Sequence, residues 1–144
     1  MKKKGILNAA LLKGLAEARH GDGIAVLDVG MPIPNDCAYI DLALIRGIPS
    51  LLDTVKAILG EVVVEKFDVF APMMKANPEM YAALCELMPT QEKGEIPGGE
   101  PFADALRKAK VIIRTAEYGR CCNMILYSAS GLDVYYEKFN IEVE

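Results

Sequence analysis

The sequence predicts a single α/β domain with three layers, in which helices cover both faces of a central mixed sheet. Short apolar runs bounded by turn residues, such as Ile24–Leu27 and Val111–Ile113, are typical of strands buried on both faces. Segments with helical spacing of apolar residues alternate with these runs through most of the chain. The length of 144 residues suits one domain. Residues 1–144 are therefore expected to form one unit.

The first half of the chain is expected to supply two helices and three strands. Asn8 can cap a helix that runs to about Arg19, and the segment His20–Gly23 ends it, because glycine accepts the left-handed conformation of a helix C-terminus. Pro49 is expected to start the second helix at its first turn. The predicted strands are Ile24–Leu27, Tyr39–Leu44 and Val62–Phe70.

The second half continues the alternation. Asn77 is expected to cap a helix that carries Tyr81, Leu84 and Met88. The segment Gln91–Glu100 holds three glycines and one proline, which predicts a loop. The remaining predicted elements are a helix over Pro101–Lys110, strands over Val111–Arg114 and Met124–Tyr127, and a terminal strand or packing arm over Tyr135–Val143.

Charge and hydropathy exclude several classes of partner. The net charge of −4 gives no electrostatic footprint for nucleic acid. Lys2, Lys3 and Lys4 are not followed by the apolar core of a signal peptide. No stretch reaches the roughly 18 apolar residues that a membrane span needs. We therefore expect no nucleic-acid or membrane partner and predict a cytoplasmic location.

The four cysteines predict neither a disulfide framework nor a metal site. Cys37, Cys85, Cys121 and Cys122 contain no C-x-x-C spacing, and without partner histidines they make a poor zinc site. We expect no metal and no other cofactor. Cys121 and Cys122 are adjacent and are expected to point to opposite faces of a strand. They are interpreted as small apolar residues in a reducing compartment, with a redox-active pair as the alternative.

His20 and Asp28 are the main candidates for chemistry. His20 is the single histidine of the chain, and its ring can either satisfy the last helix carbonyls or shuttle protons near neutral pH. Asp28 can either cap the turn after its strand or accept hydrogen bonds from a polyhydroxyl ligand, or orient the histidine ring. The two residues flank one strand, and five extended residues span more than about 15 Å. They should not share a site within one chain unless loops fold back or a neighbouring subunit supplies one of them.

No other catalytic constellation stands out. The chain contains no phosphate-binding glycine loop and no nucleophile elbow. Arg114 differs from the other cations, because it follows an apolar strand and needs a partner there. Glu117 or a subunit contact is expected to supply it.

Several segments together resemble the D-ribose pyranase and fucose mutarotase family. The likeness runs from residue 1 to about 128, and Asp28-Val-Gly-Met-Pro is similar to the ribose-type members, whereas the fucose type has Asn and an aromatic residue before its proline. The segments that carry the resemblance are Met1–Asn8, His20–Asp22, Asp28–Pro34, Ile40–Leu44, Gly47–Ser50, Val111–Glu117 and Asn123–Leu126.

The resemblance implies an isomerase that interconverts ring forms or anomers of a free sugar, with D-ribose the favoured substrate. In the family, the residue matching His20 is the proton donor and the residue matching Asp28 binds sugar. A closing Tyr-x-Asn segment also binds sugar, and it matches Cys121, Cys122 and Asn123 here. The family forms decameric rings with sites between neighbouring subunits, which would bring His20 and Asp28 of different chains together.

The chain departs from the family pattern at two positions of the expected site. Cys121 replaces the tyrosine of Tyr-x-Asn, and Gly99 stands where a second histidine is expected. Glu100, Asp104 or Arg107 lie close enough in sequence to take over the proton transfer. The alternative is a ring of the same fold that binds a sugar or polyol without turnover, and a purely structural or regulatory oligomer is a third hypothesis. Residues 133–144 extend past the usual family end.

Overall fold

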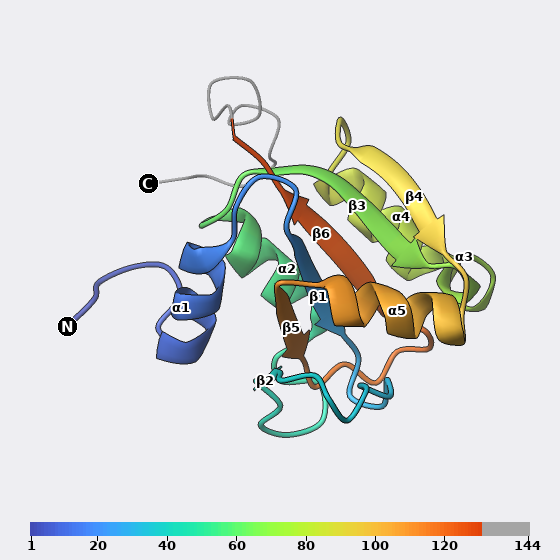
Figure 1. Cartoon of the computed structure of the whole chain (residues 1–144), viewed down its shortest axis with the longest axis horizontal. Helices are drawn as coiled ribbons and strands as arrows, with labels where there is room; N and C mark the ends of the chain where they lie inside the picture. Colours follow the sequence, from blue (N-terminus) through green and yellow to red (C-terminus); the bar gives the residue numbers. More distant parts are fainter. Residues whose placement is uncertain (131–144) are drawn as a thin grey trace.

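Six strands form one mixed sheet in the computed structural model of this chain, which describes residues 1–130. The strand order is β2-β5-β1-β6-β3-β4 (Figure 1). In chain order the strands are β1 (Gly23–Leu27), β2 (Ile40–Asp41), β3 (Val64–Phe70), β4 (Glu92–Ile96), β5 (Val111–Arg114) and β6 (Met124–Ser128).

β6 runs antiparallel to both of its neighbours, β1 and β3, while the other pairs in the sheet are parallel. As a result, the carboxyl ends of β1 and β3 lie beside the amino end of β6. We call this side of the sheet the carboxyl edge. The opposite side, where β1 and β3 begin and β6 ends, is called the amino edge.

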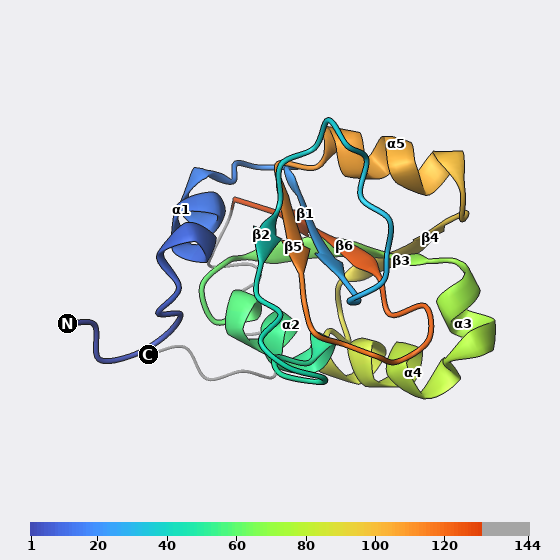
Figure 2. The ribbon, with the colours of Figure 1, turned by 90° about the horizontal axis from the view of Figure 1, so that it is seen from below.

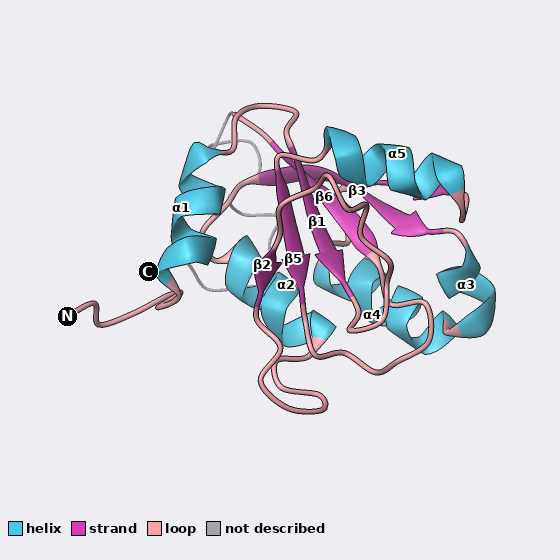
Figure 3. Ribbon diagram, turned by 60° about the horizontal axis from the view of Figure 1, so that its bottom comes forward, coloured by secondary structure: helices cyan, strands magenta, loops and turns pink. Residues whose placement is uncertain are grey.

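Helices cover both faces of the sheet, which confirms the expected three-layer arrangement. α5 (Glu100–Lys108) packs on one face, and the other helices lie on the opposite face (Figures 2 and 3). That second group consists of α1 (Ala9–Glu17), α2 (Leu51–Leu59), α3 (Pro72–Ala76) and α4 (Pro78–Leu87).

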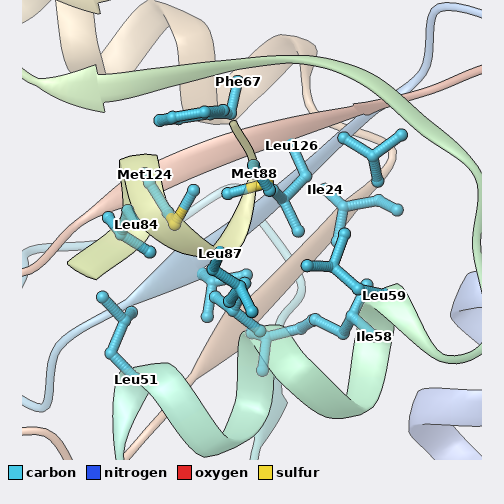
Figure 4. Packing of buried hydrophobic residues seen from close by; sticks show 14 of the residues in the cluster. Ile24, Leu51, Ile58, Leu59, Phe67, Leu84, Leu87, Met88, Met124 and Leu126 are labelled. Atoms are coloured by element: carbon cyan, nitrogen blue, oxygen red, sulfur yellow. The ribbon is translucent and has the colours of Figure 1, made fainter. Parts of the chain in front are cut away.

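The larger core lies between the sheet and α2 and α4. Phe67, Met124 and Leu126 of the sheet belong to this core together with Leu51 and Ile58 of α2, and Figure 4 shows part of it. A smaller core under α5 contains Ala25, Leu27, Phe102, Leu106, Ile112 and Ile125. β1 contributes alternate residues to both cores and is buried throughout. This explains why its sequence is an uninterrupted apolar run.

The predicted strands β1, β5 and β6 and the caps at Asn8 and Asn77 are confirmed. The side chain of Asn8 accepts from the amide of Leu11, and that of Asn77 accepts from the amide of Met80. The first helix is shorter than expected, because it ends at Glu17 rather than near Arg19.

Three predictions about secondary structure were wrong. Part of the expected loop Gln91–Glu100 is the edge strand β4, whose residues are mostly exposed, so a polar sequence suffices there. Pro49 precedes α2 instead of opening it, and Ser50 caps that helix by accepting from the amide of Asp53. Only Ile40–Asp41 of the expected strand over 39–44 pairs in the sheet, and the short helix α3 was not expected.

Within residues 1–130, no helix is long and apolar enough to cross a membrane. The same residues contain no group of three histidine, cysteine or acidic side chains placed to hold a metal ion. The expected terminal element over Tyr135–Val143 and the extension over 133–144 lie outside the described residues.

Candidate functional site

A cleft opens at the carboxyl edge, where β1 and β3 end and where α5 and β6 begin. Its volume is about 500 Å³, within the usual range of small-molecule sites. The polar side chains of Asp28 and Asn123 line it together with Cys121, and Phe70 and Phe102 supply apolar surface. Clefts at the carboxyl ends of strands are the usual ligand sites of α/β sheets.

Asp28 is held at this edge by Asn123, although 95 residues separate them. The side-chain Nδ2 of Asn123 donates to Oδ2 of Asp28 at 2.9 Å, and its Oδ1 accepts from the amide of Asp28 at 2.8 Å. The amide of Gly30 donates to the other carboxylate oxygen at 3.1 Å. Asp28 therefore does cap the turn after β1, as one interpretation predicted, and it also lines the cleft.

The environment of Asp28 favours its neutral form more than water does. Burial raises the pKa of the Asp28 carboxyl above its ordinary value of 3.8, and the hydrogen bonds from Asn123 and Gly30 oppose that shift. Each carboxylate oxygen has two lone pairs, so accepting one hydrogen bond on each leaves capacity for ligand hydroxyls. The carboxyl group is oriented before any ligand arrives.

The two departures from the family pattern both lie at this cleft. Gly99 has φ of +79° and precedes α5, and a Cβ placed on it would meet no atom within 4 Å. Cys121 has φ of 56° and lines the same cleft. The positions of the expected second histidine and tyrosine thus both line the cleft.

Cys122 is placed differently from Cys121. Its side chain is fully buried. The side-chain amide of Asn77 donates to its Sγ at 3.3 Å. Burial, followed by the nearby carboxylates of Glu117 and Asp28, raises the pKa of the Cys122 thiol to about 12. The expectation that Cys121 and Cys122 lie on a strand was wrong, because both precede β6. A thiol held in its neutral form does not favour the redox alternative.

His20 lies at the amino edge, in the turn between α1 and β1. Its Nδ1 accepts from the backbone amide of Ser130 at 3.0 Å, and its Nε2 is 3.7 Å from Oε1 of Glu65. The ring therefore does not cap the helix carbonyls. β1 separates His20 from Asp28, so one chain does not bring the two candidates together, as their spacing predicted.

Arg114 has a different partner from the one expected. Its guanidinium donates to both carboxylate oxygens of Asp41 at 3.1 Å and to the carbonyl of Val29. Glu117 instead accepts from the amides of Leu51 and Gly119. Its carboxylate thereby satisfies an amide at the start of α2, where negative charge is favourable.

Sequence reasoning missed the aromatic walls of the cleft. Phe70 and Phe102 contact each other edge to face, with ring centroids 5.0 Å apart. Phe70 comes from β3 and Phe102 from α5. Neither residue stands in a motif, and only the position of Phe70 at the end of an apolar strand could have indicated it.

The fold and the cleft define an α/β protein with a cleft of small-molecule size at the carboxyl edge of its sheet, where Asn123 holds the carboxylate of Asp28. Residues 1–130 match the model of the RbsD / FucU transport protein family. The chain belongs to this family.

Several D-ribose pyranases are similar to this chain over most of its length. The D-ribose pyranase of Laribacter hongkongensis (strain HLHK9) is 39% identical over 128 residues, which cover 89% of this chain and 97% of that protein. The D-ribose pyranase of Geobacillus thermodenitrificans (strain NG80-2) is 38% identical over 128 residues, covering 89% of this chain and 96% of that protein.

Solved structures agree with the fold. Bacillus subtilis RbsD complexed with D-ribose matches with a TM-score of 0.84 and 37% identity, covering 91% of this chain and 99% of that one. The fucose mutarotase of Streptococcus pneumoniae in complex with L-fucose matches with a TM-score of 0.69 at 20% identity, covering 87% and 94%. The latter likeness supports the fold alone.

Proposed function

We propose that this protein is a mutarotase that interconverts the pyranose and furanose forms, or the anomers, of a free monosaccharide, with D-ribose as the first candidate. The observation that carries the proposal is the likeness to D-ribose pyranases over almost their whole length. The structural match to RbsD complexed with D-ribose supports the same sugar.

The reaction needs only proton transfers and orientation. When the sugar ring opens, the bond between the anomeric carbon and the ring oxygen breaks. The ring oxygen gains a proton, and the anomeric hydroxyl loses one. Closure through a different hydroxyl then gives the other ring size. A histidine near neutral pH suits this general acid–base chemistry, and we assign that role to His20.

The cleft at the carboxyl edge is assigned to sugar binding. Asp28 accepts hydrogen bonds from sugar hydroxyls, and Asn123 holds Asp28 in place while lining the same cleft. Cys121 contacts the sugar where the family has a tyrosine, and Cys122 supports the turn that carries Cys121.

Because β1 separates His20 from Asp28, a complete site requires two copies of the chain. We propose that His20 of one subunit faces the cleft of its neighbour within a ring-shaped homo-oligomer, which the family resemblance indicates to be a decamer. A cytoplasmic location stays a prediction from the sequence.

Saturation-exchange NMR on free sugars tests the proposal. Spectra of D-ribose and L-fucose are recorded with the wild-type protein, with His20→Ala and without protein. We expect faster exchange between pyranose and furanose signals of D-ribose. In His20→Ala the rate falls by about a hundredfold or more, while sugar affinity stays within a few fold.

This chain has Gly99 and Cys121 where the family pattern has a second histidine and a tyrosine, which favours a second candidate, a ring that binds sugar without turnover. In that case no sugar would exchange faster with protein than without it, while saturation transfer would still report binding. This result would overturn the mutarotase proposal.

A further inference from the structure

A cluster at the amino edge contains His20 and two residues that have no role in the function proposed above. It consists of His20, Glu65 and Ser130, which come from the turn before β1, from β3 and from the segment that follows β6. The three residues are far apart in the sequence and are brought together by the pairing of β6 with its two neighbours.

The Ser130 contact fixes which ring nitrogen of His20 carries the proton. A backbone amide can only donate, and the Ser130 amide donates to Nδ1 at 3.0 Å. Nδ1 must then be unprotonated, so the neutral ring carries its hydrogen on Nε2. The amide of Ala129 donates to the carbonyl of Val63 at 2.9 Å, which ties the segment before Ser130 to β3.

Glu65 faces the other ring nitrogen. Its Oε1 lies 3.7 Å from Nε2 of His20, which is longer than a direct hydrogen bond. The carboxylate therefore acts on the ring through its charge and leaves the Nε2 hydrogen available. The side chain of His20 is 59% exposed and that of Glu65 is 29% exposed, so the pair is open to a ligand from outside the chain.

β3 is irregular at Glu65. The pairing register between β3 and β6 shifts between Val64 and Lys66, which leaves Glu65 as the extra residue of a bulge. Bulges re-aim a side chain and recur beside active sites. In a regular strand, side chains alternate between the two faces of the sheet, and this alternation alone would fix the face on which Glu65 lies.

We propose that Glu65 and the backbone amide of Ser130 are positioning groups that hold His20 as its Nε2–H tautomer, with Nε2 as the nitrogen presented to the sugar. This inference rests on the proposed acid–base role of His20. Neither group contacts the sugar, and both act through the imidazole ring.

Because the chain has one histidine, tag-free protein labelled with ¹⁵N in histidine gives a single imidazole spectrum. Long-range proton–nitrogen correlation is recorded at alkaline pH, where the ring is neutral, for the wild type, Glu65→Gln and Glu92→Gln. Glu92 is an exposed residue of β4 and serves as the matched control. Exchange kinetics of D-ribose are measured on the same samples.

We expect the wild-type ring to be in the Nε2–H form alone. Glu65→Gln should shift the Nε2 resonance and lower kcat by about tenfold, a part of what a general acid–base residue contributes. KM should stay within about twofold, because no sugar contact is lost. Glu65→Asp should restore part of the rate, and Glu92→Gln should change neither the spectrum nor the rate.

A mixture of tautomers like that of a short histidine peptide, or an Nδ1–H form, would overturn the inference. So would a Glu65→Gln variant that behaves as Glu92→Gln does. If the wild type accelerates no sugar exchange but shows the Nε2–H form and its dependence on Glu65, the mutarotase proposal fails and the placement of His20 is supported.

Discussion

The two edges of the sheet hold different kinds of polar group. At the carboxyl edge, Asp28 is half-buried and hydrogen-bonded to an asparagine that is 1% exposed. At the amino edge, His20 stands largely in solvent beside Glu65. At the first edge the carboxylate is held at a cleft within one chain, whereas at the second edge the imidazole side chain is 59% exposed.

The proposed function therefore divides sugar binding and proton transfer between the two edges. Hydrogen bonds from Asn123 and Gly30 orient the Asp28 carboxylate without a ligand. This carboxylate lines a cleft of about 500 Å³. An exposed imidazole gains a dry, shaped surrounding only when another surface covers it. The exposure of His20 therefore favours a site assembled from two copies of the chain. Substitutions at the carboxyl edge test how that edge contributes to it.

Asn123→Ala removes the support of the carboxyl edge and should have the largest effect among these changes. It leaves the amide of Asp28 and its carboxylate without their buried partner, which costs about 1–3 kcal/mol of the free energy of unfolding. Sugar affinity should fall with it. Urea unfolding and saturation-transfer titration measure the two effects.

Asn35→Ala is the control for Asn123→Ala, because Asn35 is exposed and does not line the cleft at Asp28. It should change neither quantity. Equal stability of the Asn123→Ala variant and the wild type would contradict the account of how Asp28 is held.

Gly99→His places a second proton carrier in the cleft and should make the carboxyl edge more like the family pattern. A Cβ there meets no atom within 4 Å, so the first side-chain atom has room. Gly99 has φ of +79° and ψ of −139°, a conformation found almost only at glycine, and it costs another residue about 1–3 kcal/mol. We expect the exchange of D-ribose to become about tenfold faster, as measured by saturation-exchange NMR.

A tenfold slower exchange in Gly99→His would show that the open space serves the sugar itself. Gly47→His is a suitable control for the backbone cost, because Gly47 also has positive φ and open space and lies outside the cleft. It should alter stability without changing the rate.

The titration of Asp28 should give the smallest effect. Burial raises the pKa of this carboxyl in the folded protein above 3.8, so the folded state binds the proton more tightly than the unfolded state. Between the pKa of the unfolded state, near 3.8, and the higher pKa of the folded state, the contribution of Asp28 to the free energy of unfolding falls as pH rises. Asp28→Asn should remove that contribution, and urea unfolding across the acidic range compares its pH dependence with that of the wild type.

An unchanged pH dependence in Asp28→Asn would mean that the hydrogen bonds from Asn123 and Gly30 fully offset the burial of the carboxyl. Glu92→Gln provides the control, because Glu92 is an exposed residue of β4. The free energy of unfolding of this control should depend on pH as that of the wild type does between neutral pH and pH 3.8, because the control keeps Asp28. A different dependence would show that Asp28 is not the source of the effect.

The sequence alone predicted the buried strands and the helix caps well. Ile24–Leu27 and Val111–Arg114 are recognisable because a strand buried on both faces needs an uninterrupted apolar run. β4 escaped prediction because an edge strand needs few apolar residues, and Glu92–Ile96 resembles a polar loop. The cis peptide before Pro49, present in the structure, also has no distinct signal in the sequence.

The candidate site was predictable only in part. His20 and Asp28 stood out as polar residues at the ends of a buried strand. The pairing of Asp28 with Asn123, however, depends on β6 lying antiparallel beside β1, which spacing along the chain does not reveal. The aromatic pair of Phe70 and Phe102 and the bulge at Glu65 likewise arise from tertiary packing.

The central claim is that the amino edge of one copy completes the carboxyl edge of another. Co-expression of His20→Ala with Asp28→Asn tests it directly, with each variant expressed alone for comparison. If sites form between subunits that mix at random, about a quarter of them contain both native residues. We expect the mixed oligomer to regain about a quarter of the wild-type rate of D-ribose exchange, whereas a rate no higher than that of the separate variants would contradict the shared site.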